Sequence, residues 1–184
     1  NITKNIASLG GGGIAVMGNN HDVNINGNSL SVVGNEASKS VDQGESIYEN
    51  GGGIFVQGVN GDSTWNDVVL SNNIGGHGGN MMINMGAKVA ITNMLVEKGT
   101  AHASGGGLYV HKASLALLTS NIKNNHAFTD GGGIAVVDGS VRLKGITMDS
   151  NRANGNGGAI HAQTSTVNNE VNATLDTLTN KNQV

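Results

Sequence analysis

The acidic side chains are the first residues to test for chemistry, because glycoside cleavage commonly uses two carboxylates about 5 to 10 Å apart in a groove. The chain has 13 Asp and Glu residues, scattered mainly over predicted turns. Glu97 and Asp149 have the best matched positions in the repeat described below, but Lys123 stands between their layers. This order predicts alternating surface charge. Since no nucleophile-elbow glycine pattern and no Ser-His-acid triad stand out either, we expect no enzymatic activity.

The six histidines are the candidates for a metal site. His111 and His161 fall on one predicted face but two repeats apart, about 10 Å along a stack of strands. That separation is too long for one ion, whose ligand bonds are about 2 Å. His126 is a predicted neighbour of Arg152, which disfavours a cation there. Since the chain also has no cysteine, disulfides and thiolate sites are excluded, and we expect neither a metal nor another cofactor.

The elements that position these side chains are defined by a glycine-rich motif that occurs six times. Two or three glycines, the last position sometimes Asn or Ala, are followed at once by an aliphatic residue. The aliphatic residues are Ile14, Ile54, Met81, Leu108, Ile134 and Ile160, at spacings of 40, 27, 27, 26 and 26 residues. A spacing this regular is typical of a protein in which each repeat is one layer of a stack.

A second motif, apolar-x-x-Asn-x-Ala, precedes the glycines in constant phase. Asparagine tolerates left-handed backbone and can bond its amide to a stacked copy of itself. We therefore expect a structural ladder of stacked asparagines with a gap where Gly99 replaces the amide. The predicted ladder residues are Asn35, Asn73, Asn125 and Asn151.

Apolar residues between the motifs alternate with period two, as in Leu108 and Val110 or Val141 and Leu143. This alternation predicts short strands with one buried face, and the 30 glycines penalise any helix. The sequence predicts an all-β fold, a right-handed parallel β-helix with about three strands per coil and six to seven coils. We expect residues 1–184 to be one domain and, because the pattern starts and ends in mid-repeat, a fragment of a longer array.

Breaks in the repeat and outward positions of its first strand are the candidate binding surfaces. Polar excursions at 38–46, 58–64 and 163–172 are expected to project from the rod. Outward strand positions predict an exposed stripe beside the first excursion. The candidate ligand-binding residues are Tyr48, Phe55, Trp65, Met82, Tyr109 and His111. Two alternatives stay open: the excursions are insertions without a partner, or the stripe is covered by a loop or a neighbouring domain.

The net charge of the chain helps to exclude some classes of binding partner. The formal net charge is −3 without a run of like charges, so we expect no nucleic acid or acidic membrane as partner. No apolar stretch reaches the 18 residues or so that a spanning helix needs, so no direct membrane span is expected.

Residues 151–160, which read Asn-Arg-Ala-Asn-Gly-Asn-Gly-Gly-Ala-Ile, resemble the paired repeat of the polymorphic outer-membrane proteins, autotransporter adhesins of chlamydiae. That family pairs Phe-x-x-Asn with Gly-Gly-Ala and an aliphatic residue; here Ile, Val, Leu or Met replaces Phe. The resemblance implies a secreted passenger segment at the cell surface or bacterial outer membrane, associated with virulence. We expect it to act in adhesion or as a structural rod. Its expected partners are a host or cell-surface protein or glycan and the flanking coils of the same parent chain. The alternative is a non-catalytic part of a carbohydrate-active, pectate-lyase-like β-helix enzyme.

Overall fold

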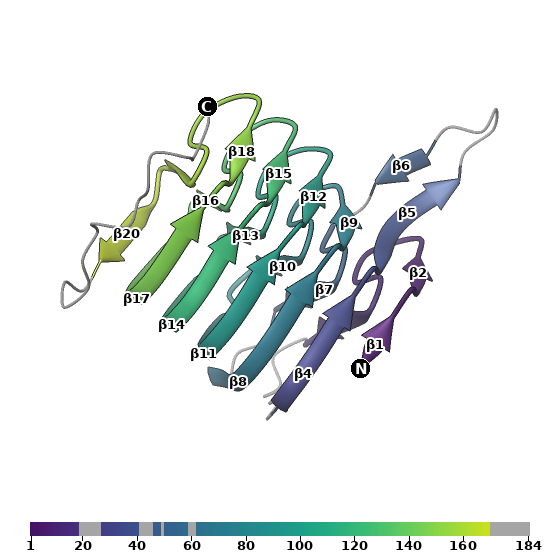
Figure 1. Cartoon of the computed structure of the whole chain (residues 1–184), viewed down its shortest axis with the longest axis horizontal. Coiled ribbons are helices and arrows are strands. Elements are labelled where there is room, and N and C mark those ends of the chain that lie inside the picture. Colours follow the sequence, from purple (N-terminus) through teal and green to yellow (C-terminus); the bar gives the residue numbers. More distant parts are fainter. Residues whose placement is uncertain (19–26, 41–45, 49, 59–61, 170–184) are drawn as a thin grey trace.

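The computed structural model describes residues 1–18, 27–40, 46–48, 50–58 and 62–169. Within these residues the chain is all β, with no helix, and it winds into a β-solenoid with three parallel sheets. Figure 1 shows the strands of each sheet side by side in sequence order along the rod. The predicted fold class is therefore confirmed.

Each turn contributes one strand to each sheet. Sheet 1 holds the longest strands: β1 (Ile2–Thr3), β4 (Gly27–Val33), β8 (Asp62–Ser71), β11 (Lys88–Glu97), β14 (Ser114–Lys123), β17 (Ser140–Asp149) and β20 (Thr166–Asn169). Sheet 2 holds β3 (Ile14–Met17), β7 (Ile54–Gln57), β10 (Met81–Asn84), β13 (Leu108–His111), β16 (Ile134–Val137) and β19 (Ile160–Gln163). Sheet 3 holds β2 (Ile6–Ala7), β5 (Glu36–Ser40), β9 (Ile74–Gly75), β12 (Thr100–Ala101), β15 (His126–Ala127) and β18 (Arg152–Ala153).

The register stacks equivalent residues directly over one another. Leu108 pairs with Ile134, and Ile134 pairs with Ile160, as the spacing of the aliphatic residues predicted. The described residues form about five turns, fewer than the six to seven coils expected for the whole chain.

The core is a narrow apolar column between the sheets. Residues such as Ile91, Leu108 and Ile134 are completely buried in it. Burial of each such side chain contributes about 1.5 to 3 kcal/mol relative to exposure. Since no single turn can enclose these side chains, the stability of each turn depends on its neighbours.

The asparagine ladder is confirmed, and its amides are saturated with hydrogen bonds. Asn125 illustrates the pattern: its Nδ2 donates to the carbonyl oxygen of Val96 at 3.1 Å and to Oδ1 of Asn151 at 2.9 Å. Its own Oδ1 accepts from the backbone N–H of Gly99 at 2.9 Å. Asn35, Asn73, Asn125 and Asn151 are each at most 1% exposed. In this dry environment a satisfied amide network specifies the register, because any slip would leave buried polar groups unpaired.

The expected gap at Gly99 is filled from another position. Asn80, in the glycine corner that leads into β10, accepts from Nδ2 of Asn73 at 2.8 Å and donates to Oδ1 of Asn125 at 3.1 Å. Its Nδ2 also donates to the carbonyl oxygen of Glu97 at 3.1 Å. A Cβ at Gly99 would collide with Nδ2 of Asn80. The Asn at position 80 and the Gly at position 99 therefore compensate for one another.

The left-handed backbone lies one residue before the ladder and not at the ladder residues themselves. Lys98, Asn124 and Ser150 have φ values of 52°, 56° and 54°, whereas no ladder asparagine has positive φ. The expectation that the ladder asparagines would occupy left-handed conformations is therefore wrong. Their role is to supply buried hydrogen bonds.

The glycine corners allow neighbouring turns to approach closely. Gly105 has φ 74°, a conformation that costs glycine little. At Gly106 a Cβ would collide with the carbonyl oxygen of Gly132 in the next turn. Backbone hydrogen bonds continue through the corner, with Gly106 N–H donating to Gly131 O at 3.0 Å.

The polar excursions behave differently from one another. Figure 1 shows β5 and the antiparallel β6 (Ser46–Tyr48) extending away from the stack, as expected for the first excursion. The expectation is wrong for the described parts of the other two, because Asp62–Thr64 belong to β8 and Thr166–Asn169 form β20. Residues 41–45, 59–61 and 170–172 of these excursions lie outside the described residues.

The compensation at the ladder gap gives a direct test. Asn80→Gly should lower the free energy of unfolding by about 3 kcal/mol, because it deletes a buried amide with three hydrogen-bond partners. Gly99→Asn alone should also destabilise, because its Cβ would collide with the Asn80 amide and with the carbonyl oxygen of Gly106. The double variant should recover part of the loss, since it restores the amide at the regular ladder position. Urea unfolding followed by circular dichroism measures these changes.

The matched control is Asn124→Gly, which changes an exposed, left-handed asparagine beside the ladder and should leave stability nearly unchanged. Strictly additive losses in the double variant would contradict the compensation.

Candidate functional site

The stripe predicted on the outer face of sheet 2 is buried. Phe55, Met82 and Tyr109 are 8%, 4% and 9% exposed and form a second apolar cluster with Ala135. The expectation that these three side chains form an exposed binding surface is therefore wrong. The alternative that the stripe is covered is the one the structure supports.

The cover comes from the segments that lead into the glycine corners. His77 places its imidazole 4.4 Å from the ring of Tyr109, measured between centroids. A Cβ built at Gly105 would collide with Cβ of Tyr109, so the corner lies directly against this face. Alternation along the strand cannot reveal this cover, because it distinguishes two faces of a strand but not what folds over the outer one.

The remaining candidate residues do not converge. Trp65 is 1% exposed and packs in the main core, so the expectation that it belongs to an exposed ligand-binding surface is wrong. Tyr48 ends β6 in the projecting hairpin, where its backbone pairs with Ser38. His111 is half-buried, and its Nδ1 lies 3.0 Å from Oδ1 of Asn84.

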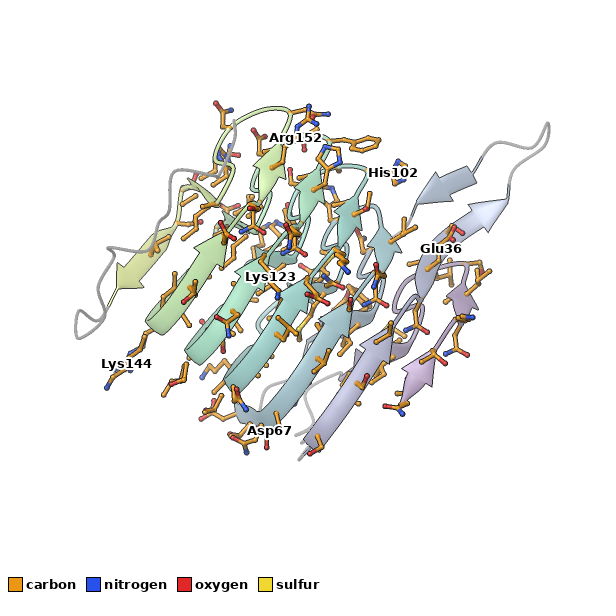
Figure 2. All side chains as sticks on the ribbon, in the orientation of Figure 1. Glu36, Asp67, His102, Lys123, Lys144 and Arg152 are labelled. Carbon is orange, nitrogen blue, oxygen red and sulfur yellow. The ribbon has the colours of Figure 1, made fainter. Side chains whose placement is uncertain are left out.

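The two carboxylates at equivalent positions of the repeat, Glu97 and Asp149, lie on either side of a lysine. In the register of sheet 1, Lys123 lies between Glu97 and Asp149, and its Nζ is 3.4 Å from Oε2 of Glu97. Figure 2 shows Lys123 near the tip of β14, where the sheet 1 strands end. The predicted charge alternation is confirmed.

Two of the described histidines pack against the same aromatic ring. The rings of His102 and His126 lie 4.8 Å and 5.0 Å from that of Phe128, and His126 pairs with Arg152 as expected. Burial lowers the pKa of His102, an effect partly opposed by Glu36 and increased by His126. Among the described residues, no group of three or more His, Cys, Asp or Glu side chains is arranged to hold a metal ion.

A groove on sheet 1, which we call the lateral groove, is the site that the sequence analysis missed. It has a volume of 440 Å³ and crosses β8, β11, β14 and β17. Its walls and floor come from two columns of outward residues, paired from strand to strand. They are Asp62, Lys88, Ser114 and Ser140 in one column, and Thr64, Ala90, Ala116 and Arg142 in the other.

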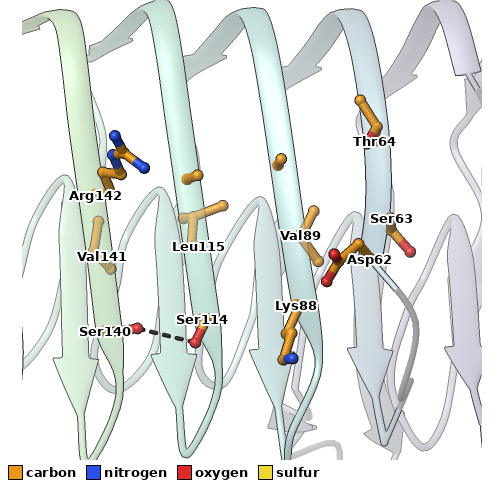
Figure 3. A pocket seen from close by; sticks show the side chains of 12 residues that line it. Asp62, Ser63, Thr64, Lys88, Val89, Ser114, Leu115, Ser140, Val141 and Arg142 are labelled. Atoms are coloured by element: carbon orange, nitrogen blue, oxygen red, sulfur yellow. Dashed lines mark hydrogen bonds between the residues drawn. The ribbon is translucent and has the colours of Figure 1, made fainter.

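The shape of the lateral groove follows from side-chain size. Ala90 and Ala116 are small, so the surface is hollow between the larger Thr64 and Arg142 at either end of their column. Figure 3 shows the Arg142 guanidinium leaning over the groove toward β14 and the Ser140 hydroxyl donating to Oγ of Ser114 at 2.9 Å. The intervening Val89, Leu115 and Val141 are buried beneath, which gives the groove a rigid base.

Two further hollows adjoin the lateral groove and extend its charge. One shares Lys88 and Ser114 with it and adds Lys112 and Asp138. The other shares Arg142 and adds Lys144, which Figure 2 shows at the edge of sheet 1. The signal for the groove is present in the sequence, because the triplets 88–90, 114–116 and 140–142 each place an apolar residue between two outward ones.

The fold defines the class: a β-solenoid whose repeat is one turn, with an amide ladder and a glycine corner in each turn. The comparison with family models agrees with this class. Residues 145–163 match the Chlamydia polymorphic membrane protein repeat. The match runs from the middle of β17 through Asn151 and the glycine corner to the end of β19, and so contains both motifs of the turn.

Other comparisons add no relative. No curated protein and no solved structure matches the chain. In the part of the chain that the structure describes, there is no helix that is long and apolar enough to cross a membrane.

Because the stripe of Phe55, Met82 and Tyr109 is buried, a substitution in it should lower the stability of the protein. If the stripe were an exposed binding surface, the same substitution would weaken binding. Phe55→Ala should lower the free energy of unfolding by about 3 kcal/mol, because it leaves a cavity in the second apolar cluster. The control is Met17→Ala in the neighbouring strand β3, where the side chain is 69% exposed and its removal should cost less than about 0.5 kcal/mol. Urea unfolding measures both, and equal effects would contradict the burial of Phe55.

The contact of His77 with Tyr109 predicts that the fold loses stability in acid. Burial lowers the pKa of His77 below its usual 6.5, and nearby His111 lowers it further. The unfolded chain therefore binds a proton on this group at a higher pH than the folded chain. The stability it contributes is complete above pH 6.5 and is lost as the pH falls through the lowered pKa.

His77→Asn should reduce this dependence, since an amide oxygen can accept the 3.4 Å bond from the Ser104 N–H and does not titrate. The urea concentration at the unfolding midpoint of the parent chain should decrease as the pH is lowered from about 7.5 to about 5. The midpoint of the variant should decrease less. An unchanged slope in His77→Asn would assign the acid sensitivity to other groups.

Proposed function

We propose that this chain is a surface-exposed, passenger-like segment of a secreted protein and that it acts in adhesion. The observation that carries the proposal is the match of residues 145–163 to the polymorphic membrane protein repeat, within a solenoid that repeats the same turn on both sides of Asn125. The name of that repeat family supports a location at the bacterial outer membrane or cell surface.

A long, rigid rod suits this role because it carries a lateral surface away from its point of attachment. The three sheets and the saturated amide ladder hold that surface in a fixed shape. The partner we propose is a host or cell-surface protein or glycan. A purely structural rod, with no partner on its surface, is the second candidate, and the regular stacking is equally suited to it.

The function we propose for this chain does not include enzymatic activity. The best matched acidic residues are separated by Lys123, and the lateral groove contains a single carboxylate, that of Asp62. Cleavage by a carboxylate pair would need a second one within about 10 Å. These features favour a binding or structural role over the carbohydrate-active alternative.

Attachment of beads to cells tests adhesion. Beads coated with the purified chain should attach to cultured animal cells several times more often than beads coated with the destabilised Asn80→Gly, Phe55→Ala double variant after mild heating. The expectation follows because binding requires the folded lateral surface, whereas coating density and composition are nearly the same. Attachment is counted by microscopy after washing.

Equal attachment of the folded and unfolded coatings would reject adhesion and favour the structural rod. A parallel incubation with polyuronates, followed by absorbance of unsaturated products, tests the enzyme alternative. Product formation by the purified chain would contradict the non-enzymatic proposal.

A further inference from the structure

We infer that the lateral groove binds an acidic oligosaccharide whose sugars carry carboxylates, that is, a uronate-containing chain. This inference deepens the proposed function by naming a ligand class for the adhesive surface, but it concerns the purified chain and one groove. It rests on the charge, the hydroxyl groups and the shape of the outward columns of sheet 1.

Charge is the first argument. The lateral groove and its two adjoining hollows contain four cationic side chains, Lys88, Lys112, Arg142 and Lys144, and two acidic ones, Asp62 and Asp138. Four positive charges less two negative charges leave +2, in a chain whose formal net charge is −3. Within the described residues, no acidic side chain lies within 4.0 Å of Nζ of Lys88. The groove therefore attracts an anion of moderate charge density.

The kind of anion follows from the geometry of the donors. Arg142 presents a planar guanidinium that matches a carboxylate with two parallel hydrogen bonds. Lys88 lies two strands away, about 10 Å across sheet 1, so the two cations suit separate acidic groups along an extended ligand. Asp62 and Asp138 at the rim disfavour a densely sulfated chain, because each would repel closely spaced anions.

Hydroxyl groups and small side chains supply the sugar recognition. Thr64, Ser114 and Ser140 line the groove with oxygens that both donate and accept hydrogen bonds. The Ser140 hydroxyl already donates to Ser114, so that pair is oriented before a ligand arrives. The methyl groups of Ala90 and Ala116 leave a shallow floor on which a sugar ring can lie.

Other ligand classes fit the groove less well. An extended peptide cannot add to the sheet here, because β11 and β14 already have hydrogen-bonded neighbours on both edges. The groove has no aromatic side chain on which a nucleobase could stack. An acidic oligosaccharide uses the charge and the hydroxyls together.

Calorimetric titration of the purified chain with hexagalacturonate tests the inference. The expected result is saturable binding that weakens as salt is added, because the charges are exposed and screened. The methyl ester of the same hexamer, neutral maltohexaose and hexaglutamate should bind at least about tenfold more weakly, since each lacks either the carboxylates or the hydroxyls.

Variants assign the binding to the groove. Lys88→Gln and Arg142→Gln should each weaken hexagalacturonate binding about fivefold, as expected for one exposed charge pair. Asp62→Asn should strengthen it severalfold by removing a repelling carboxylate. The matched control is Arg152→Gln, which removes an exposed cation from β18 in sheet 3 and should change affinity less than about twofold.

The inference is overturned if the parent chain does not bind hexagalacturonate, if hexaglutamate binds equally well, or if Arg152→Gln weakens binding as much as the groove variants do. Melting curves of all variants confirm that they remain folded, which is expected because Lys88, Arg142 and Asp62 are exposed. Since no cell takes part, failure of this titration is distinct from failure of bead attachment.

Discussion

Stacking of equivalent residues is held in register by a buried row of amides at the junction of sheets 1 and 3. Each amide in the middle of the row hydrogen-bonds to the turns on either side, as Asn125 does with Val96 and Asn151. A slip by one residue would leave these groups unpaired in a dry core, where each costs about 1 to 3 kcal/mol. Apolar side chains alone tolerate such slips more readily, because one aliphatic contact resembles another. The hydrophobic column stabilises the solenoid, and the amides select its register.

The same constraint controls the surface. Because each outward residue sits above its equivalent in the neighbouring turn, side-chain chemistry is arranged in columns. One column alternates Glu97, Lys123 and Asp149, so each charge has a neighbour of opposite sign. Another has small residues in the middle, at Ala90 and Ala116, and becomes the floor of the lateral groove. A binding surface on this architecture arises from a column, so several ordinary residues from different turns form it together.

The ladder gap at Gly99 shows that the structure requires a buried amide in every turn, but not at one particular position of the repeat. Asn80 reaches the ladder from the glycine corner and bonds to Asn73 and Asn125, while Gly99 leaves it room. Among the described turns, only the one that begins at Asn80 has asparagine as the third residue of the corner, and only this one lacks asparagine at the ladder position. The amide row is therefore continuous although the motif is interrupted.

The sequence by itself determined the period, the parallel strands, the identity of the stacked aliphatic residues and four ladder asparagines, because these depend on local spacing and on like residues meeting at each turn. It also predicted that Lys123 separates Glu97 from Asp149. Tertiary structure alone decided what covers the outer face of sheet 2, where segments such as that of His77 fold over Phe55, Met82 and Tyr109. It also decided that Asn80 completes the ladder and that Arg142 leans toward β14 to shape the groove. Period-two alternation assigns a side chain to one of two faces, but burial depends on the path of the connecting segments, which no strand pattern records.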